Sequence, residues 1–186
     1  MVRRLCFFVF ILMTAKGSAA QATIGGRLLL FSDESLSECA LSDDGPQVAD
    51  IFVVHDHSLD TRLIRFRLIA SQGFTGTWLG DVLPSGITEG LGDSKTGIQL
   101  TYASCPEQPQ IILRVKYQML GTSSVCSSVR TAEYPGTSFI EMMSCHFDNW
   151  PVDADTLYVN PNETCPCATS VAVRSSTWGR VKALYR

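Results

Sequence analysis

Residues 111–119 of this chain read IILRVKYQM, and their hydrophobic period decides the fold class. Apolar side chains recur at every second position from Ile111 to Met119. The positions between them hold Ile112, Arg114, Lys116 and Gln118. A period of two puts successive side chains on opposite faces of a β-strand. We therefore expect a strand with one buried face and one face, carrying Arg114 and Lys116, that meets water.

Two further stretches, 64–68 and 98–102, show the same alternation. In both stretches the even-numbered positions are apolar, and the positions between them are basic or polar. Arg65 and Arg67 should face water for the same reason as the basic residues of 111–119. The three stretches together predict a core that contains Ile64, Phe66, Leu68, Ile98, Leu100, Tyr102, Leu113, Val115 and Tyr117.

Shorter apolar runs complete a set of about eight strands. These runs lie at 27–31, 50–54, 138–143, 156–159 and 170–173. Segments rich in Gly, Pro, Asn and Asp predict turns at 43–46, 83–86, 90–97, 134–136 and 160–162. No long stretch between the two ends of the chain keeps a helical period. Short strands with this punctuation favour an all-β fold, an antiparallel β-sandwich of the immunoglobulin-like kind.

The first 20 residues have the features of a secretory signal peptide. Arg3 and Arg4 supply positive charge, residues 5–13 are an unbroken apolar run, and small residues precede Gln21. The apolar run is shorter than the roughly 20 residues that span a bilayer. We expect cleavage after Ala20 and no transmembrane segment in the mature chain. The protein should be secreted, extracellular or attached to the cell surface, or should reside in a periplasm.

Cleavage makes the chain more acidic. The 186 residues hold 15 basic and 18 acidic side chains and carry a formal charge of −3. Loss of Arg3, Arg4 and Lys16 leaves 12 basic side chains and lowers the formal charge to −6. Binding to nucleic acid needs a basic patch, so we expect no nucleic-acid partner. The sandwich domain should occupy residues 21–174, which is enough chain for one sizeable core.

Six of the seven cysteines remain after cleavage, namely Cys39, Cys105, Cys126, Cys145, Cys165 and Cys167. An even number in an exported chain predicts disulfides. No C-x-x-C pair is present, which disfavours a zinc knuckle and a thioredoxin-type redox site. We expect no cofactor and no metal.

Strand direction predicts which cysteines meet, because successive antiparallel strands end alternately at the top and the bottom of a sandwich. On this basis Cys105 lies beside Cys145. Cys126 lies beside Cys165 or Cys167, and Cys39 takes the one that remains. Six cysteines allow 15 pairings, so the scheme depends on the order of the strands.

The C-terminal residues 175–186 change period from two to 3.6. Trp178, Val181, Leu184 and Tyr185 share one helical face, and the basic residues lie off it. A helix of about ten residues is marginal in water unless its apolar face docks on something. We expect an amphipathic tail that is an appendage for export, attachment or partner docking. The alternative is that it packs back on the domain.

The ending S-T-W-G-R-V-K-A-L-Y-R resembles the closing motif of a group of secreted bacterial proteins of uncharacterised function. They combine a signal peptide, a cysteine-containing β domain and a T-W-G-x-[IV]-K-x-[LM]-[YF] tail. The L-L-F-S-D-E-S segment before Cys39, the G-I-Q-L-T-Y-A-S-C arm at 97–105 and N-P-N-E-T-C-P-C are similar too. A second resemblance, of strand pattern only, is to cohesin-like and other immunoglobulin-like sandwiches, and it implies nothing beyond the fold.

Residues that could carry chemistry are few. His55 and His57 leave the same face of an expected strand, and His146 could add a third imidazole to a metal site. The alternative is that they are solvated histidines at the end of a strand. Acid pairs at 33–34, 43–44 and 153–155 match no calcium-loop signature and are expected to be solvated turn residues. The chain also lacks the G-x-S-x-G nucleophile motif.

Trp78 and Trp150 are the candidate binding residues, because each lies among glycines or polar residues. An aromatic plane beside polar groups suits a sugar or a peptide. The alternative is that both fill the core. Asn162-Glu163-Thr164 fits the glycosylation sequon and also a plain turn. We expect a non-enzymatic module for adhesion, scaffolding or binding of a protein or carbohydrate, and the alternative is a secreted hydrolase.

Overall fold

The computed structural model describes residues 25–56, 60–106 and 109–166, and every regular element in these ranges is a β-strand. The expected signal peptide (1–20), the expected strand at 170–173 and the C-terminal tail (175–186) lie outside the described residues. The twelve strands are β1 (Arg27–Phe31), β2 (Ala40–Leu41), β3 (Pro46–Asp56), β4 (Thr61–Ala70), β5 (Thr77–Val82), β6 (Ile87–Asp93), β7 (Gly97–Tyr102), β8 (Gln110–Leu120), β9 (Ser127–Ala132), β10 (Ile140–Ser144), β11 (Asn149–Val152) and β12 (Thr156–Val159).

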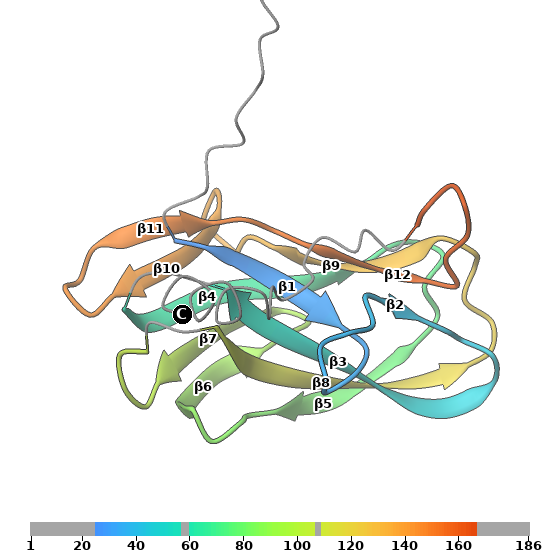
Figure 1. Ribbon diagram of the computed structural model, residues 1–186, viewed down its shortest axis with the longest axis horizontal. Helices are drawn as coiled ribbons and strands as arrows, with labels where there is room; N and C mark the ends of the chain where they lie inside the picture. The colour runs from blue at the N-terminus through green and yellow to red at the C-terminus, as the bar shows by residue number, and fades with distance from the viewer. Residues whose placement is uncertain (1–24, 57–59, 107–108, 167–186) are drawn as a thin grey trace, which may run out of the picture.

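The strands form two sheets that pack face to face (Figure 1). The first sheet has the order β1-β3-β8-β5. The second has the order β11-β10-β4-β9-β12-β2, with β7 paired to β4 and β6 paired to β7. All of these pairs are antiparallel except β12 with β2. The expected all-β fold, an antiparallel sandwich with disulfides, is confirmed.

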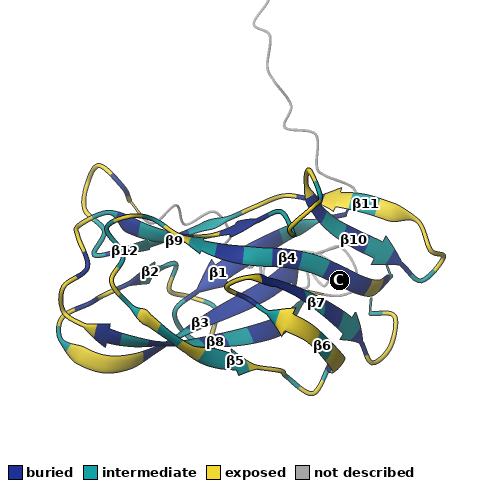
Figure 2. Ribbon diagram, turned by 180° about the vertical axis from the view of Figure 1, so that it is seen from behind, coloured by how far each residue is buried: buried dark blue, intermediate teal, exposed yellow. Residues whose placement is uncertain are grey.

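The core between the sheets contains every residue that the alternating stretches predict. Figure 2 shows how buried and less buried residues alternate along β4 and β8. The basic residues between them, Arg65, Arg67 and Arg114, lie on the outer faces as expected, but they are half-buried in ion pairs. Their partners are Glu141, Glu133 and Asp50, which neighbouring elements supply.

The expected register is wrong at the first residues of β8. Ile112 is fully buried in the main core, whereas Ile111 is only partly buried and packs on the outer side of the sheet. The cause is a β-bulge: Val53 and Val54 are adjacent on β3 but lie opposite Leu113 and Ile111. Because β8 has one extra residue there, the side chains before the bulge point to the opposite faces from those that strict alternation predicts.

Several strands were not predicted, and one predicted turn is wrong. Residues 90–93 belong to strand β6 instead of a turn, and only 94–96 connect it to β7. The glycines that suggested a turn lie in an edge strand, where Gly92 has a positive φ and close contact with the carbonyl of Gly97. The sequence also did not predict β2, β5, β9 and β11, whose residues are too polar or too few to show an apolar period.

Two disulfides follow the expected directions of the strands. Cys105 bonds to Cys145, with 6.2 Å between the Cα atoms, and Cys126 bonds to Cys165, with 5.8 Å. Each joins loops at one end of the sandwich. Cys39 is disulfide-bonded as well. Its expected pairing with Cys167 stays a prediction, since Cys167 lies outside the described residues.

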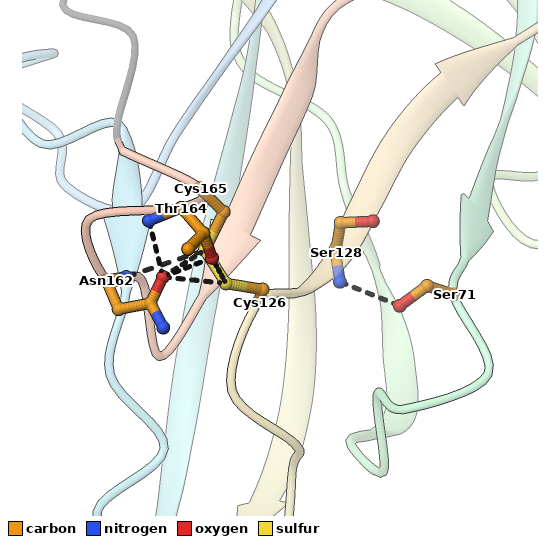
Figure 3. The surroundings of a disulfide bond; sticks show 6 residues. All are labelled: Ser71, Cys126, Ser128, Asn162, Thr164 and Cys165. Carbon is orange, nitrogen blue, oxygen red and sulfur yellow. Dashed lines mark hydrogen bonds between the residues drawn. A yellow bond between two sulfur atoms is a disulfide. The ribbon is translucent and has the colours of Figure 1, made fainter.

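The residues around Cys126–Cys165 form a tight turn (Figure 3). The side-chain oxygen of Asn162 accepts hydrogen bonds from the backbone N–H and the hydroxyl of Thr164, at 2.8 and 2.7 Å. This oxygen also lies 3.2 Å from Cys126 Sγ, which is a contact only, because a disulfide sulfur has no hydrogen to donate. Asn162 and Thr164 of the sequon thus hold the turn beside the disulfide.

Candidate functional site

Strands β5 and β6 form one margin of the sandwich. β5 is the last strand of the first sheet and pairs only with β8, and β6 ends the other sheet through β7. Residues 83–86 connect the two strands, so the chain crosses here from one sheet to the other. Both views show β5 and β6 along the same margin (Figures 1 and 2). No ladder of backbone hydrogen bonds joins these two strands.

On the inner side of this margin, side-chain hydrogen bonds join β5 to the second sheet. Asp81 on β5 accepts two bonds from Ser94 in the β6–β7 turn, one from its backbone N–H and one from its hydroxyl, both of 2.6 Å. The carbonyl of Ser94 in turn accepts a bond from the N–H of Leu68 on β4, at 2.6 Å. Ser94 is fully buried, so it ties β5 to the centre of the opposite sheet.

Trp78, one of the two candidate binding residues, belongs to this closure. Its ring is partly buried against the main core, and its N–H lies 3.3 Å from Asp81 and 3.2 Å from Ser94. Lys95 lies over the ring, with Nζ 5.8 Å from the centroid. The indole therefore uses its single donor inside the molecule. Burial, together with the negative charge of Asp81, raises the pKa of the neighbouring Tyr117 to about 12.

Outside this closure, apolar side chains are exposed. Of nine large hydrophobic residues that the described chain leaves exposed, four lie within the thirteen residues 79–91, which makes this margin the densest exposed apolar segment. They are Leu79, Val82, Leu83 and Leu91, exposed by 51, 43, 41 and 52%. We call these four residues the margin patch. The side chain of Leu83 lies over Gly90 of β6, since a Cβ built on Gly90 would lie 3.2 Å from the Leu83 side chain.

The two strands differ in how their free edges are protected. β5 has a bulge between Trp78 and Gly80, which leaves Leu79 without a partner on β8. A bulge twists an edge away from further pairing. β6 has its own irregularity between Ile87 and Glu89 and a positive φ at Gly92, but each residue from Glu89 to Asp93 has a partner on β7. This part of β6 is an exposed strand edge with few side chains to obstruct it.

The other strands at the edges of the sheets have features that hinder pairing with a further strand. β1 is bridged to Asp153, whose backbone exchanges hydrogen bonds with Leu28 and Gly26, so that side of the sandwich is closed. β11 carries Pro151, which has no N–H to offer to a further strand. β2 consists of two residues. Among the described strands, β6 therefore has the longest run, Glu89–Asp93, that is paired on one side only and carries no bulge, proline or bridge to another segment.

Trp150, the second candidate, lies on β11 opposite Met142 and packs partly against the main core. A Cβ on Gly25 would meet the Pro151 carbonyl and lie 3.2 Å from the Trp150 Cβ, so the chain approaches β11 closely there. The structure does not bring Trp150 and Trp78 together. They lie on terminal strands of different sheets.

The two histidines that the structure describes, His55 and His146, do not form the cluster that a metal site would require. His55 is fully buried, so the expectation of a solvated side chain is wrong for it. Its ring nitrogens lie 2.8 Å from the hydroxyl of Tyr102 and 2.9 Å from the carbonyl of Gly25. His146 is exposed and lies 3.6 Å from Asp60, and His57 is outside the described residues. Within the described ranges, no group of three His, Cys, Asp or Glu side chains could hold a metal ion.

The acid pairs have structural roles, and the expectation of solvated acids is wrong at Asp43. Asp43 is buried and accepts bonds from the N–H groups of Gly121 (2.6 Å) and Ser123 (2.9 Å). Burial alone would raise its pKa, but the hydrogen bonds from the Ser123 hydroxyl and from the backbone outweigh burial and lower it. Asp155 accepts a bond from the N–H of Leu30, and so fastens the β11–β12 connection to β1.

Asp33 has a local role in the loop after β1. The loss of hydration on partial burial raises the pKa of its carboxyl, but hydrogen bonds from Ser35, Glu38 and Ser37 prevail and lower it to about 2. The carboxylate accepts the backbone N–H groups of Ser37 and Glu38 at 2.9 and 2.7 Å. These bonds fold the segment between Asp33 and Glu38 into a compact turn.

No protein-family model matches the sequence, and no curated protein matches it at a significant level. Among solved structures, the chain is similar to the sixth cohesin of scaffoldin B from Acetivibrio cellulolyticus, in complex with a Cel5 dockerin. The identity is 6%, the TM-score is 0.49, and the match covers 73% of this chain and 98% of that one. A non-cellulosomal cohesin from the archaeon Archaeoglobus fulgidus is 9% identical, with a TM-score of 0.49 over 72% and 91%.

A cohesin module of a family 33 glycoside hydrolase from Clostridium perfringens is 7% identical, with a TM-score of 0.46 over 75% and 99%. All three similarities have an identity below 10% and a TM-score below 0.5. The described residues include no helix that is long and apolar enough to cross a membrane.

The sequence did not predict the margin patch. Leu83 and Leu91 fall in the stretches 83–86 and 90–97, which suggested turns, and no apolar alternation marks Leu79 and Val82. The available signal was the pair of short stretches 77–82 and 87–93, each bounded by Gly or Pro, which could have been taken for edge strands.

Proposed function

We propose that this protein is an exported, non-enzymatic module that binds another protein through its β5–β6 margin. The observation that carries the proposal is the margin patch beside the unprotected edge of β6. Large apolar side chains that are exposed along one margin of a folded domain indicate an interaction site. The internal closure by Asp81, Ser94 and Trp78 supports it, because this margin can then present apolar side chains without opening the core.

The chemistry of the margin favours a protein over a carbohydrate as the partner. Its exposed side chains are aliphatic, and the aromatic ring of β5 itself, Trp78, is partly buried and already donates its hydrogen bond. Sugar sites use exposed aromatic planes with free polar groups beside them. The free backbone edge of β6 offers N–H and C=O groups, which an extended peptide can pair with.

We propose strand addition as the mode of binding. An extended segment of the partner would lie along Glu89–Asp93 and place its apolar side chains against Leu91 and Leu83. Main-chain hydrogen bonds would supply affinity, and the leucines would supply selectivity. The chain itself occupies the space beside the two glycines of this stretch, since a Cβ on Gly90 would meet Leu83 and a Cβ on Gly92 would meet the carbonyl of Gly97.

The proposal is tested by comparing surface variants of the mature protein for retention of proteins from the producing cells' own exported fraction. Leu91→Glu should abolish retention of a discrete partner that the unmodified protein retains. Val125→Glu is the matched control, since Val125 is 60% exposed and lies in the β8–β9 loop. Retention that is equal for both variants would rule out the β5–β6 margin as the binding surface.

A further inference from the structure

A second apolar cluster lies on the outer face of the first sheet. Its four members are Leu29, Phe31, Phe52 and Val54, which are only 3–7% exposed. Their neighbours along the chain, Leu28, Leu30, Ile51 and Val53, belong to the main core. Because successive side chains of a strand point to opposite faces, the four residues lie on the side away from the other sheet. We call them the outer cluster.

The outer cluster is compact. Phe31 lies opposite Phe52, and Leu29 lies opposite Val54, in the antiparallel pair of β1 and β3. The outer face of a two-layer sandwich ordinarily meets water, so four buried apolar side chains there require a cover. The described apolar residues that pack against the cluster are Leu36, from the loop after β1, and Ile111, from β8 itself, and the guanidinium of Arg114 lies over the Phe52 ring, 5.6 Å from its centroid. Leu36 and two residues of β8 are a small cover for two phenylalanines, a leucine and a valine.

We propose that the C-terminal segment Trp178–Arg186 packs on the outer cluster and completes this cover. The segments 57–59 and 107–108 are three and two residues long and are too short to do so. The expected signal peptide is removed from the mature chain. The C-terminal segment has the required chemistry, since Trp178, Val181, Leu184 and Tyr185 share one helical face.

A disulfide from Cys39 would tether the chain that leads to this segment close to the cluster. It ends the loop that carries Leu36, and it is disulfide-bonded. The other described cysteines bond to one another, in the pairs Cys105–Cys145 and Cys126–Cys165. In the mature chain, Cys167 is then the partner that remains for Cys39. A Cys39–Cys167 bond would leave eleven residues to reach Trp178, a span of at most about 40 Å, which is ample across a small domain.

The charges at the rim of the cluster suit the same segment. The loop after β1 exposes the carboxylates of Glu34 and Glu38 to solvent. Asp33 lies in the sequence between β1 and these two residues. The C-terminal segment carries Arg180, Lys182 and Arg186 off its apolar face. A basic amphipathic helix over this loop would bring opposite charges together, each pair adding a modest stabilisation at the surface.

This proposal adopts the alternative that the sequence left open, in which the tail packs back on the domain. It stands apart from the proposed binding function, because the outer cluster lies on β1 and β3, whereas the margin patch lies along β5 and β6. A tail that covers the outer cluster removes that face from use by a partner.

The first test is to map the disulfides of the unreduced mature protein by proteolysis and mass spectrometry. A linked pair of peptides that contain Cys39 and Cys167 is the expected result. A Cys39 joined to any other cysteine would overturn the proposed tether.

The second test detects the contact itself without any mutation. In isotope-labelled mature protein, nuclear Overhauser effects should connect the ring of Trp178 with the methyl groups of Val54 and Leu29. They should keep their intensity per molecule on dilution, because the contact is intramolecular. Their absence from a folded, assigned sample, or their loss on dilution, would overturn the proposal.

The third test measures coupling by thermal unfolding. Trp178→Ala should lower the melting temperature by roughly 6–15 °C, as expected for a buried aromatic side chain in a domain of this size. Its effect should be much smaller in a Phe52→Leu background, since both residues share one contact. In a Leu91→Ala background it should stay undiminished. A Trp178→Ala variant that has the same melting temperature as the unmodified protein would overturn the proposal.

Discussion

Nδ1 of His55 lies 2.8 Å from the hydroxyl of Tyr102, and this contact joins β3 of one sheet to β7 of the other. Nε2 of the same ring lies 2.9 Å from the carbonyl oxygen of Gly25. A carbonyl can only accept, so Nε2 carries the proton and the Tyr102 hydroxyl donates to Nδ1 in the neutral ring. Burial raises the pKa of Tyr102 well above its usual range, so this donor keeps its proton.

Removal of the Tyr102 hydroxyl should therefore destabilise the fold. Tyr102→Phe leaves a buried ring nitrogen without its donor, which costs about 1–3 kcal/mol of unfolding free energy. Tyr117→Phe is the matched control, because Tyr117 is also buried but its hydroxyl has no hydrogen bond within the described ranges. Chemical denaturation measures both variants. Equal losses of stability would contradict the role assigned to the His55–Tyr102 contact.

Asp43 should make stability depend on pH in the acid range. Its pKa is lower in the folded protein than the ordinary value of 3.8, so the fold favours the charged form. This contribution is fully present above pH 4 and is lost as the pH falls through the lowered pKa. Asp43→Asn should reduce the unfolding free energy at pH 7 by about 2–3 kcal/mol and flatten its decline below pH 4.

The control for this prediction is the neighbouring residue. Asp44 is exposed, and Asp44→Asn should change the unfolding free energy at pH 7 by less than about 0.5 kcal/mol. Urea denaturation between pH 7 and pH 2 measures both variants. If Asp43→Asn followed the pH profile of the unmodified protein, the buried carboxylate would not be the cause of the acid sensitivity.

The two described disulfides should stabilise the fold by similar amounts. They close loops with sequence separations of 40 and 39 residues, for which the chain-entropy model gives about 4 kcal/mol each. Cys105→Ser with Cys145→Ser, and Cys126→Ser with Cys165→Ser, test them separately in guanidinium. A pair whose loss leaves the midpoint unchanged would contradict a structural role for that bond.

The core prediction is tested at Phe66, which is fully buried between the sheets. Phe66→Ala should cost about 3–5 kcal/mol, because it removes apolar burial and leaves a cavity. Leu91→Ala, at a position that is half exposed on β6, should cost less than about 1 kcal/mol. Denaturation of the two variants side by side measures the difference. Similar costs would mean that the assignment of inner and outer faces is wrong.

The sequence predicted the fold class because the central strands have a clear period. β4, β7 and β8 each bury one face, and alternation along them identifies both the core and the outer arginines. The direction of these strands was also enough to pair Cys105 with Cys145. The failure at Ile111 and Ile112 comes from a bulge, which depends on the partner strand and leaves no local mark.

The candidate site could not be predicted in the same way. Edge strands β5 and β6 are not buried on either side along most of their length, so hydrophobic period is weak in them. Their glycines lie within the edge strands, although glycine in a sequence usually suggests a turn. The burial of His55 and Asp43 was missed because it depends on contacts 30 to 80 residues away along the chain.

The most direct test of the proposed function is site-specific photocrosslinking in cells that export the protein. A photoreactive phenylalanine analogue replaces Leu91 on β6 or, as control, Val125 in the β8–β9 loop, both of which are exposed. We predict that illumination links the Leu91 variant to a discrete partner protein and leaves the Val125 variant unlinked to it. A folded, exported Leu91 variant that forms no such adduct, or the same adduct from both positions, would contradict binding at the β5–β6 margin.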